Sequence, residues 1–253
     1  MSQNIVFLHG WGVNSGIWRD YTEQLLSEVP DIAVHLIDLP GYGTQVSAEC
    51  DGDIVAMARS CLERAPENAI WVGWSLGGMV ALQAALLDES AQISALQLIC
   101  TSPKFVSDGE WAAGVDLEVF QRFADELKAD YRRTLSVFLL MQSGKNFGAR
   151  ELAQRAHEAI CEYDAPSVLT LQSGIDCLRD ADLRGAIPQI SVPCQVIAGS
   201  LDRVANPEGS AEMARLLNAQ FEVLDAGHAP FLTQPDKTLA LMKVLIASVG
   251  RND

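Results

Sequence analysis

Six short apolar runs, separated by helix-like segments, place the strongest constraint on what this chain can fold into. Their apolar character is nearly continuous, as strands covered by helices on both faces require. The alternation predicts an α/β fold of about six mostly parallel strands with helices on both faces. The 253 residues, 49% of them hydrophobic, suffice for one folding unit. The runs are residues 5–8, 33–39, 69–73, 96–100, 194–198 and 221–224.

This rhythm fails in the middle of the chain, where helical spacing replaces strand-like runs. We therefore predict a core formed by residues 1–103 and 182–253, with a helical lid inserted at residues 104–181. If one helix runs over residues 117–138, its apolar residues share one face that packs downward. These residues are Leu117, Phe120, Ala124, Leu127, Tyr131, Leu135 and Phe138.

Residues 69–81 read as a strand, a sharp turn and a helix, with the pattern G-x-S-x-G at the turn. In such a nucleophile elbow, strained backbone lifts the serine clear of the sheet, and glycines at positions 73 and 77 avoid collisions with neighbouring chain. A bare G-x-S-x-G also occurs in ordinary glycine-rich turns, but the flanking strand and helix favour the elbow. Ser75 is thus the predicted nucleophile.

A serine hydroxyl needs a general base and an acid that orients the base. His228 follows a predicted strand in a turn marked by Gly227 and Pro230, and Asp202 follows the preceding strand. The order Ser75, Asp202, His228 fits an α/β hydrolase triad. Asp225 is the competing acid, although its place three residues before the histidine favours a role in shaping that loop.

Acyl transfer also requires donors for the oxyanion. The backbone N–H of Leu76, directly after the serine, is the first candidate. The second is the N–H of Trp11, in the loop His9-Gly10-Trp11-Gly12 that follows the first predicted strand.

With these motifs, the chain resembles the α/β-hydrolase superfamily over nearly its whole length. Residues 38–43, Asp-Leu-Pro-Gly-Tyr-Gly, look like the D-x-P-G-x-G loop of that superfamily. Within it, the chain looks most like the BioH-type pimeloyl-[acyl-carrier-protein] methyl ester esterases of biotin synthesis. That resemblance lies in residues 9–12, 18–19, 38–43, 69–78, 102–105, 110–111 and 227–231.

The resemblance implies a carboxylesterase that releases methanol from a methyl ester presented on acyl carrier protein. Residues 121–155 carry seven basic and four acidic residues, whereas the whole chain has a net charge of −15. A basic lid could meet an acidic carrier protein. An ordinary solvated lid with arginines paired to neighbouring acids remains the alternative. The docking candidates are Arg133 and Arg150, followed by Arg122 and Arg155.

Aromatic residues near these motifs are candidates for lining an apolar acyl channel between core and lid, although each could instead serve core packing. They are Trp11, Trp74, Phe105, Trp111 and Phe138. Core packing is the favoured role for the last three, whereas Trp11 and Trp74 flank the predicted catalytic atoms and favour the pocket. In one departure from the superfamily, the sequence reaches the His9 loop almost at once. This leaves no room for the antiparallel hairpin that commonly opens the fold.

Other classes are disfavoured. No apolar run approaches the length of a membrane span, and no basic stripe suits nucleic acid. No phosphate loop, dinucleotide fingerprint or metal-ligand cluster implies a cofactor or metal. We expect a cytoplasmic monomer with reduced cysteines. The alternatives are a general short-chain carboxylesterase, a carbon–carbon bond hydrolase, or a non-catalytic binding protein on the same scaffold.

Overall fold

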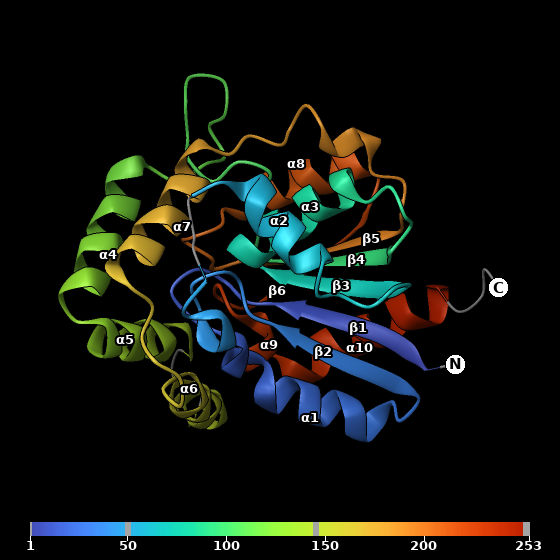
Figure 1. The fold of residues 1–253 in the computed structure, drawn as a ribbon, viewed down its shortest axis with the longest axis horizontal. Coiled ribbons are helices and arrows are strands. Elements are labelled where there is room, and N and C mark those ends of the chain that lie inside the picture. The colour runs from blue at the N-terminus through green and yellow to red at the C-terminus, as the bar shows by residue number, and fades with distance from the viewer. Residues whose placement is uncertain (1, 49–51, 144–146, 250–253) are drawn as a thin grey trace.

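The computed structural model describes residues 2–48, 52–143 and 147–249 (Figure 1). The strands are β1 Gln3–Leu8, β2 Ile32–Ile37, β3 Ala69–Trp74, β4 Ile93–Ile99, β5 Cys194–Gly199 and β6 Gln220–Leu224. The helices are η1 Ser15–Trp18, α1 Arg19–Glu28, η2 Gly43–Gln45, α2 Ile54–Leu62, α3 Leu76–Leu87, α4 Leu117–Ala129, α5 Tyr131–Ser143, α6 Phe147–Ile160, α7 Val168–Asp180, η3 Ile187–Gln189, α8 Pro207–Leu217, α9 Pro230–Thr233 and α10 Pro235–Val249.

The six strands form one sheet in the order β2-β1-β3-β4-β5-β6, and every pair of neighbours is parallel. All six predicted strands are confirmed, with shifts of one to three residues at their ends. The shared direction brings the carboxyl ends of the strands to one edge of the sheet. Loops from that edge carry the candidate catalytic residues.

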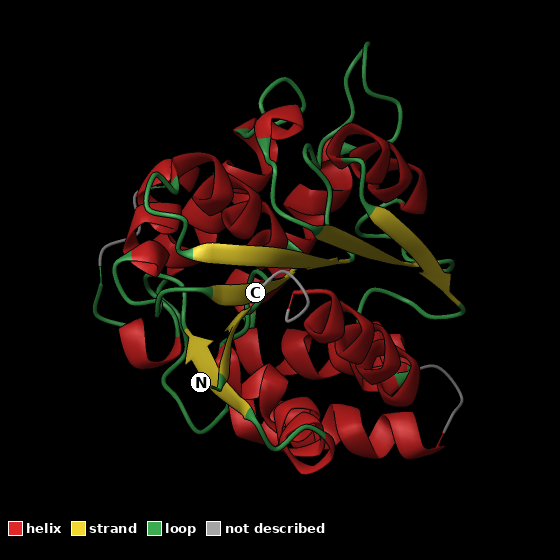
Figure 2. Ribbon diagram, turned by 90° about the vertical axis from the view of Figure 1, so that its right-hand side faces the viewer, coloured by secondary structure: helices red, strands yellow, loops and turns green. Residues whose placement is uncertain are grey.

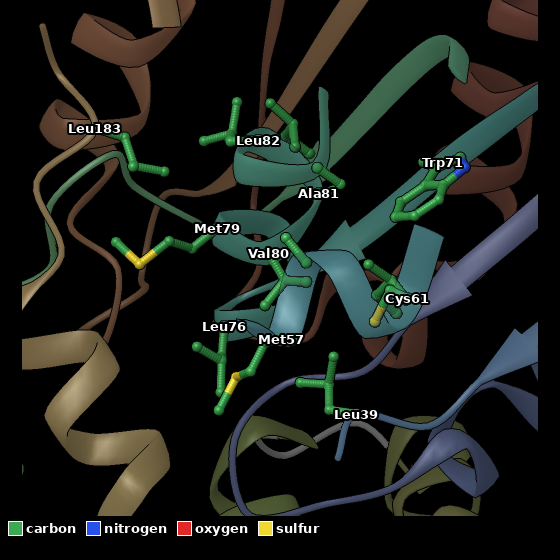
Figure 3. Close-up of a cluster of buried hydrophobic side chains, with 14 of the residues drawn as sticks. Leu39, Met57, Cys61, Trp71, Leu76, Met79, Val80, Ala81, Leu82 and Leu183 are labelled. Atoms are coloured by element: carbon green, nitrogen blue, oxygen red, sulfur yellow. The ribbon is translucent and has the colours of Figure 1, made fainter. Parts of the chain in front are cut away.

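Helices cover both faces of the sheet, as the continuous apolar runs require (Figure 2). Helices α2, α3 and α8 pack on one face around Met57, Met79 and Met213. Figure 3 shows part of this layer, in which Leu76 and Val80 of α3 lie beside Met57. On the other face, α1 and α10 pack against alternate residues of the strands, among them Phe7. The two layers hold the sheet rigid beneath the site.

Helices α4–α7 follow β4 and precede β5, and they lie on the side where the strands end (Figure 1). The prediction of one helix over residues 117–138 is wrong. Asp130 has extended backbone (φ −151°, ψ 89°), and its carboxylate accepts a hydrogen bond from the N–H of Arg133 at 3.2 Å. Aspartate favours such a capping position, so one helix ends here and the next begins.

The predicted apolar stripe is divided between these two helices. Leu127, Leu135 and Phe138 are buried, Tyr131 is half-buried, and Leu117 is 40% exposed. The side chains of Phe120 and Ala124 lie outside the described residues. The part of the stripe nearest the core therefore packs as predicted, whereas the start of α4 faces solvent.

Candidate active site

Ser75 sits between β3 and α3 in a strained backbone conformation, with φ +56° and ψ −121°. A non-glycine residue in such a region costs about 1–3 kcal/mol and needs support from its surroundings. The Ser75 N–H donates to the carbonyl of Ile99 at 3.1 Å. Its carbonyl oxygen accepts from Gly78 N at 3.0 Å and from Thr101 Oγ1 at 2.7 Å. This is the geometry predicted for a nucleophile elbow.

The predicted oxyanion loop lies directly against this elbow. A Cβ atom placed on Gly10 would lie 3.2 Å from Ser75 Cβ, and one on Gly77 would lie 2.4 Å from the carbonyl oxygen of His9. Glycine is required at position 77, where backbone blocks a Cβ atom, and a Cβ atom at position 10 would be tight against Trp74 and Ser75. The loop carrying Trp11 and the first turn of α3, which begins at Leu76, thus flank the serine, as an oxyanion site requires.

The candidate base and acid form a buried pair. His228 Nδ1 lies 2.8 Å from Asp202 Oδ2, and the two side chains are 2% and 0% exposed. Asp202 Oδ1 accepts hydrogen bonds from the N–H groups of Val204 at 2.8 Å and Ala205 at 3.0 Å. The carboxylate is thereby fixed to receive the Nδ1–H of the ring. His228 is held in the tautomer that leaves Nε2 able to accept a proton.

The competing residues lie elsewhere. Asp225 is exposed, and its carbonyl oxygen accepts a hydrogen bond from Gln234. His35 contacts Asn4 across β1 and β2, and His157 lies on α6 near the carbonyl of Arg132. Asp202 is therefore the acid that the structure brings to His228. The Trp74 ring links this pair to the elbow, because its Nε1–H donates to the His228 carbonyl at 2.7 Å.

A second buried pair, His9 and Asp38, supports the oxyanion loop. His9 Nε2 accepts the N–H of Leu39 at 3.0 Å, which requires that nitrogen to be unprotonated, and Nδ1 lies 2.8 Å from the carbonyl of Gly10. Burial lowers the pKa of His9 despite the nearby Asp38 carboxylate, so the ring is neutral. Asp38 itself accepts the N–H of Ser15 at 2.7 Å. Sequence reasoning assigned His9 no role beyond adjoining this loop, although its position directly before Gly10 was a signal that could have indicated one.

The neutral state of His9 makes folding stability depend on pH. The unfolded chain protonates this ring below its usual pKa of 6.5, but the folded chain does so only at lower pH. The free energy of unfolding should therefore fall with decreasing pH, by up to about 1.4 kcal/mol for each pH unit below 6.5. Urea denaturation at pH 8 and pH 5 measures this, with His9→Gln as the comparison. Equal pH dependence in both proteins would contradict it.

The five predicted pocket aromatics take different places. Trp74 and Phe138 lie beside His228, with ring centroids 5.3 and 6.2 Å from the imidazole. Trp11 bridges to α7, because its Nε1–H donates to the carbonyl of Leu171 at 2.9 Å. The other two, Phe105 and Trp111, are also buried, but their contacts lie away from His228. Phe105 packs in the same core cluster as Trp11, and Trp111 donates to the Lys104 carbonyl beneath the Arg184 guanidinium.

The four arginines proposed for docking also differ. Arg122 on α4 and Arg133 on α5 are exposed, and within the described part of the chain neither forms an ion pair. Arg150 is exposed on α6. Arg155 instead pairs with Asp20 of α1, with 2.6 Å between nitrogen and oxygen. That contact joins α6 to α1, and pairing with an acidic residue is the structural role considered for these arginines.

One group of potential metal ligands occurs among the described residues, and it includes the base and acid. Cys100 Sγ, a carboxylate oxygen of Asp202 and a ring nitrogen of His228 all lie within 4.8 Å of one another. Burial and the neighbouring carboxylate hold the pKa of the Cys100 thiol well above its usual value. A protonated thiol and an acid already engaged by three N–H donors are poor metal ligands. The arrangement suits proton transfer.

Comparisons with known proteins agree with this geometry. Residues 5–241 match the model of the alpha/beta hydrolase family. The chain is 36% identical to a pimeloyl-[acyl-carrier protein] methyl ester esterase of Vibrio cholerae, covering 92% of this chain and 90% of the relative. It is 34% identical to the esterase of that name from Serratia marcescens, covering 97% and 94%. An esterase structure from Exiguobacterium antarcticum superimposes with a TM-score of 0.84 at 27% identity, covering 98% and 92%.

Proposed function

Because the chain belongs to the α/β hydrolase family and is a carboxylic ester hydrolase, we propose that it cleaves the methyl ester of a pimeloyl group held on acyl carrier protein. The curated relatives that match over about nine-tenths of their length carry that activity in their names. This reaction would serve biotin synthesis. The buried pairing of His228 with Asp202, which Trp74 joins to the strained turn at Ser75, is the observation that supports the proposal.

In the proposed reaction, Ser75 Oγ attacks the ester carbonyl carbon while His228 Nε2 takes the hydroxyl proton. The N–H groups of Leu76 and Trp11 stabilise the oxyanion. The bond from carbon to the methoxy oxygen breaks, and the histidine returns the proton, so that methanol leaves. Water then attacks the acyl-serine by the same proton relay. The products are a free carboxylate and regenerated Ser75, with Asp202 stabilising the imidazolium in both halves.

The apolar walls of the site support an aliphatic acyl chain. Trp74 and Phe138 border the imidazole, and Trp11 joins the oxyanion loop to the lid helix α7. We assign these three side chains to the acyl channel, together with Phe105 in the neighbouring cluster. Trp111 makes its contacts near Lys104 and Arg184, so we place it at the outer end of that channel.

The substrate assignment predicts a preference for the carrier-bound ester. We expect kcat/KM for methyl-pimeloyl carrier protein to exceed that for free dimethyl pimelate by roughly a hundredfold, because carrier contacts contribute binding energy that the free ester lacks. Methanol release measures both reactions. Equal values would favour a general short-chain carboxylesterase. If the protein hydrolyses neither ester nor p-nitrophenyl acetate, the non-catalytic alternative holds instead.

We propose that the exposed arginines of the lid supply those carrier contacts. The double variant Arg122→Glu, Arg133→Glu should raise KM for the carrier-bound ester roughly tenfold and leave dimethyl pimelate unaffected, because exposed charge pairs contribute about 0.2–1 kcal/mol each and reversal adds repulsion. Added salt should reduce the difference in KM between the variant and the native protein, because salt screens exposed charges.

The matched control for this variant is Arg59→Glu, Lys237→Glu. It changes the charge equally at exposed positions on α2 and α10. Similar KM increases in both double variants would show that only total charge matters, and would reject docking by α4 and α5. Arg150 and Arg155 can be reversed singly. We expect the smaller effect at Arg155, which already pairs with Asp20.

The surroundings of the proposed reaction follow from other observations. No helix in the described residues is long and apolar enough to cross a membrane. Cys61, Cys100, Cys161 and Cys194 are free thiols, whereas Cys50 lies outside the described residues. Free thiols favour a reducing compartment, so we place the reaction in the cytoplasm.

A further inference from the structure

The two residues that follow β4, Cys100 and Thr101, contact opposite ends of the candidate catalytic machinery. The Thr101 hydroxyl donates to the carbonyl oxygen of Ser75 at 2.7 Å. The Cys100 sulfur lies within 4.8 Å of both an Asp202 carboxylate oxygen and a His228 ring nitrogen. Both side chains are completely buried. Two consecutive residues after β4 therefore contact different parts of the site. Thr101 contacts the candidate nucleophile, and Cys100 lies near the acid and the base.

The backbone of Cys100 and Thr101 directs their side chains to opposite sides. Cys100 has φ +46°, a left-handed conformation that costs a non-glycine residue about 1–2 kcal/mol. It is fixed by its N–H, which donates to the carbonyl of Ile197 in β5 at 2.8 Å. The next carbonyl, that of Thr101, accepts the hydroxyl of Ser210 from α8 at 2.8 Å. A strained turn held by β5 and α8 directs the two side chains to their separate targets.

On the serine side, Thr101 packs as well as donates. A Cβ atom placed on Gly78 would lie 2.6 Å from Thr101 Cγ2, so the methyl group fills the space over the first turn of α3. The hydroxyl reaches the peptide group that joins Ser75 to Leu76. That peptide carries both the strained carbonyl and the N–H assigned to the oxyanion. The Thr101 hydroxyl is the side-chain donor that helps to orient this peptide, alongside the backbone N–H groups of Gly78 and Met79 at 3.0 and 3.2 Å.

On the acid side, the Cys100 thiol lies beneath the junction of β5 and the histidine loop. Its S–H donates to the Gly227 carbonyl oxygen, 3.8 Å from the sulfur, and the sulfur also lies within 4.8 Å of an Asp202 carboxylate oxygen. Burial and the charge of Asp202 hold the pKa of this thiol well above its usual value, so it is an uncharged, weak donor. Asp202 and the titratable His228 ring are the groups that face it from the β5 and β6 loops.

We propose that Cys100 and Thr101 form a brace at the end of β4, in which Thr101 positions the peptide after the nucleophile and Cys100 sets how strongly Asp202 engages His228. Both are positioning residues, because neither reaches the substrate. A thiol suits the second task because it fills the space beside Asp202 without competing strongly for the carboxylate. The proposal rests on the Ser75, Asp202 and His228 mechanism proposed above, and it is independent of which ester is cleaved.

The Thr101 half is tested by separating the hydroxyl from the methyl group. Thr101→Val keeps the shape and removes the hydrogen bond, and should lower kcat for p-nitrophenyl acetate about tenfold with KM within twofold. The rate of Ser75 labelling by a fluorophosphonate should fall by the same factor. Thr101→Ser keeps the hydroxyl and should stay within threefold of the native rate. If Val and Ser variants have equal rates, or if only thermal stability changes, the hydroxyl has no positioning role.

The Cys100 half predicts pH shifts of opposite sign. Cys100→Ser introduces a stronger donor that draws on the Asp202 charge, so the acid limb of the kcat/KM profile should move to lower pH by about half a unit. Cys100→Ala removes the donor and should move that limb to higher pH. Loss of packing alone cannot shift the limb in both directions. If the acid limb does not move in either variant, or moves in the same direction in both, the role proposed for Cys100 is wrong.

These measurements use a free ester and an active-site label, so they distinguish the brace from the substrate assignment. Native protein that hydrolyses p-nitrophenyl acetate but not carrier-bound ester leaves the brace testable and rejects the substrate. Native protein that neither hydrolyses esters nor reacts with the fluorophosphonate rejects the triad, and the brace with it.

Discussion

Ser75→Ala is expected to reduce kcat on ester substrates by roughly 10⁴ to 10⁶-fold and to abolish labelling by a fluorophosphonate, because the variant has no oxygen that can form the acyl intermediate. The oxyanion donors and the aromatic walls remain, so KM should change little. Initial rates with p-nitrophenyl acetate and mass spectrometry of labelled protein measure the two effects.

The matched control for that variant is Ser27→Ala, an exposed serine on α1. It should retain native kcat and native labelling. The midpoint of thermal unfolding should be similar in all three proteins, since the alanine at position 75 adopts the same backbone as the serine. Substantial labelling of Ser75→Ala would assign the nucleophile to another residue.

Asp202→Asn should lower kcat about 10⁴-fold with little change in KM. The carboxylate receives the Nδ1–H of His228 at 2.8 Å, whereas an amide can present its NH₂ group to that nitrogen and favour the wrong tautomer. The ring then carries its proton on Nε2 and cannot accept one from Ser75. Single-turnover rates with p-nitrophenyl acetate would locate the loss in acylation.

Asp225→Asn provides the control for the acid, because Asp225 was the competing candidate and lies exposed near the same histidine. Its kcat should remain within twofold of the native value. A larger loss at Asp225 than at Asp202 would contradict the assignment. Fluorophosphonate labelling should slow in Asp202→Asn alone, since the label reacts with the same activated oxygen.

The strand pattern was predictable because parallel strands are buried on both faces and so appear as continuous apolar runs. All six occur where the sequence indicated them. The helices between β4 and β5 were harder to predict. Helical periodicity continues across Asp130, and only the folded backbone shows that its carboxylate caps Arg133 and divides α4 from α5. A local capping contact overrode a pattern that hydrophobic spacing alone treats as continuous.

The residues of the candidate site also differ in how far the sequence could predict them. The three candidate triad residues follow from motif and chain order, whereas nothing in the sequence linked Cys100 to them. Its sulfur lies within 4.8 Å of an Asp202 carboxylate oxygen because β4 and β5 are neighbours in the sheet although they are far apart in sequence. Likewise, the sequence placed Asp38 in a supporting loop but did not link it to the neutral His9 ring.

The amino-acid sequence by itself determined the layered α/β architecture and the turn that places Ser75 between β3 and α3, and it limited the acid to Asp202 or Asp225. Each depends on local spacing or on residues required within one short segment. Tertiary structure decided which acid pairs with His228, that Arg155 forms an ion pair with Asp20, and which residues support the oxyanion loop. These depend on the close approach of distant segments, which only the packing of helices on the sheet fixes in three dimensions.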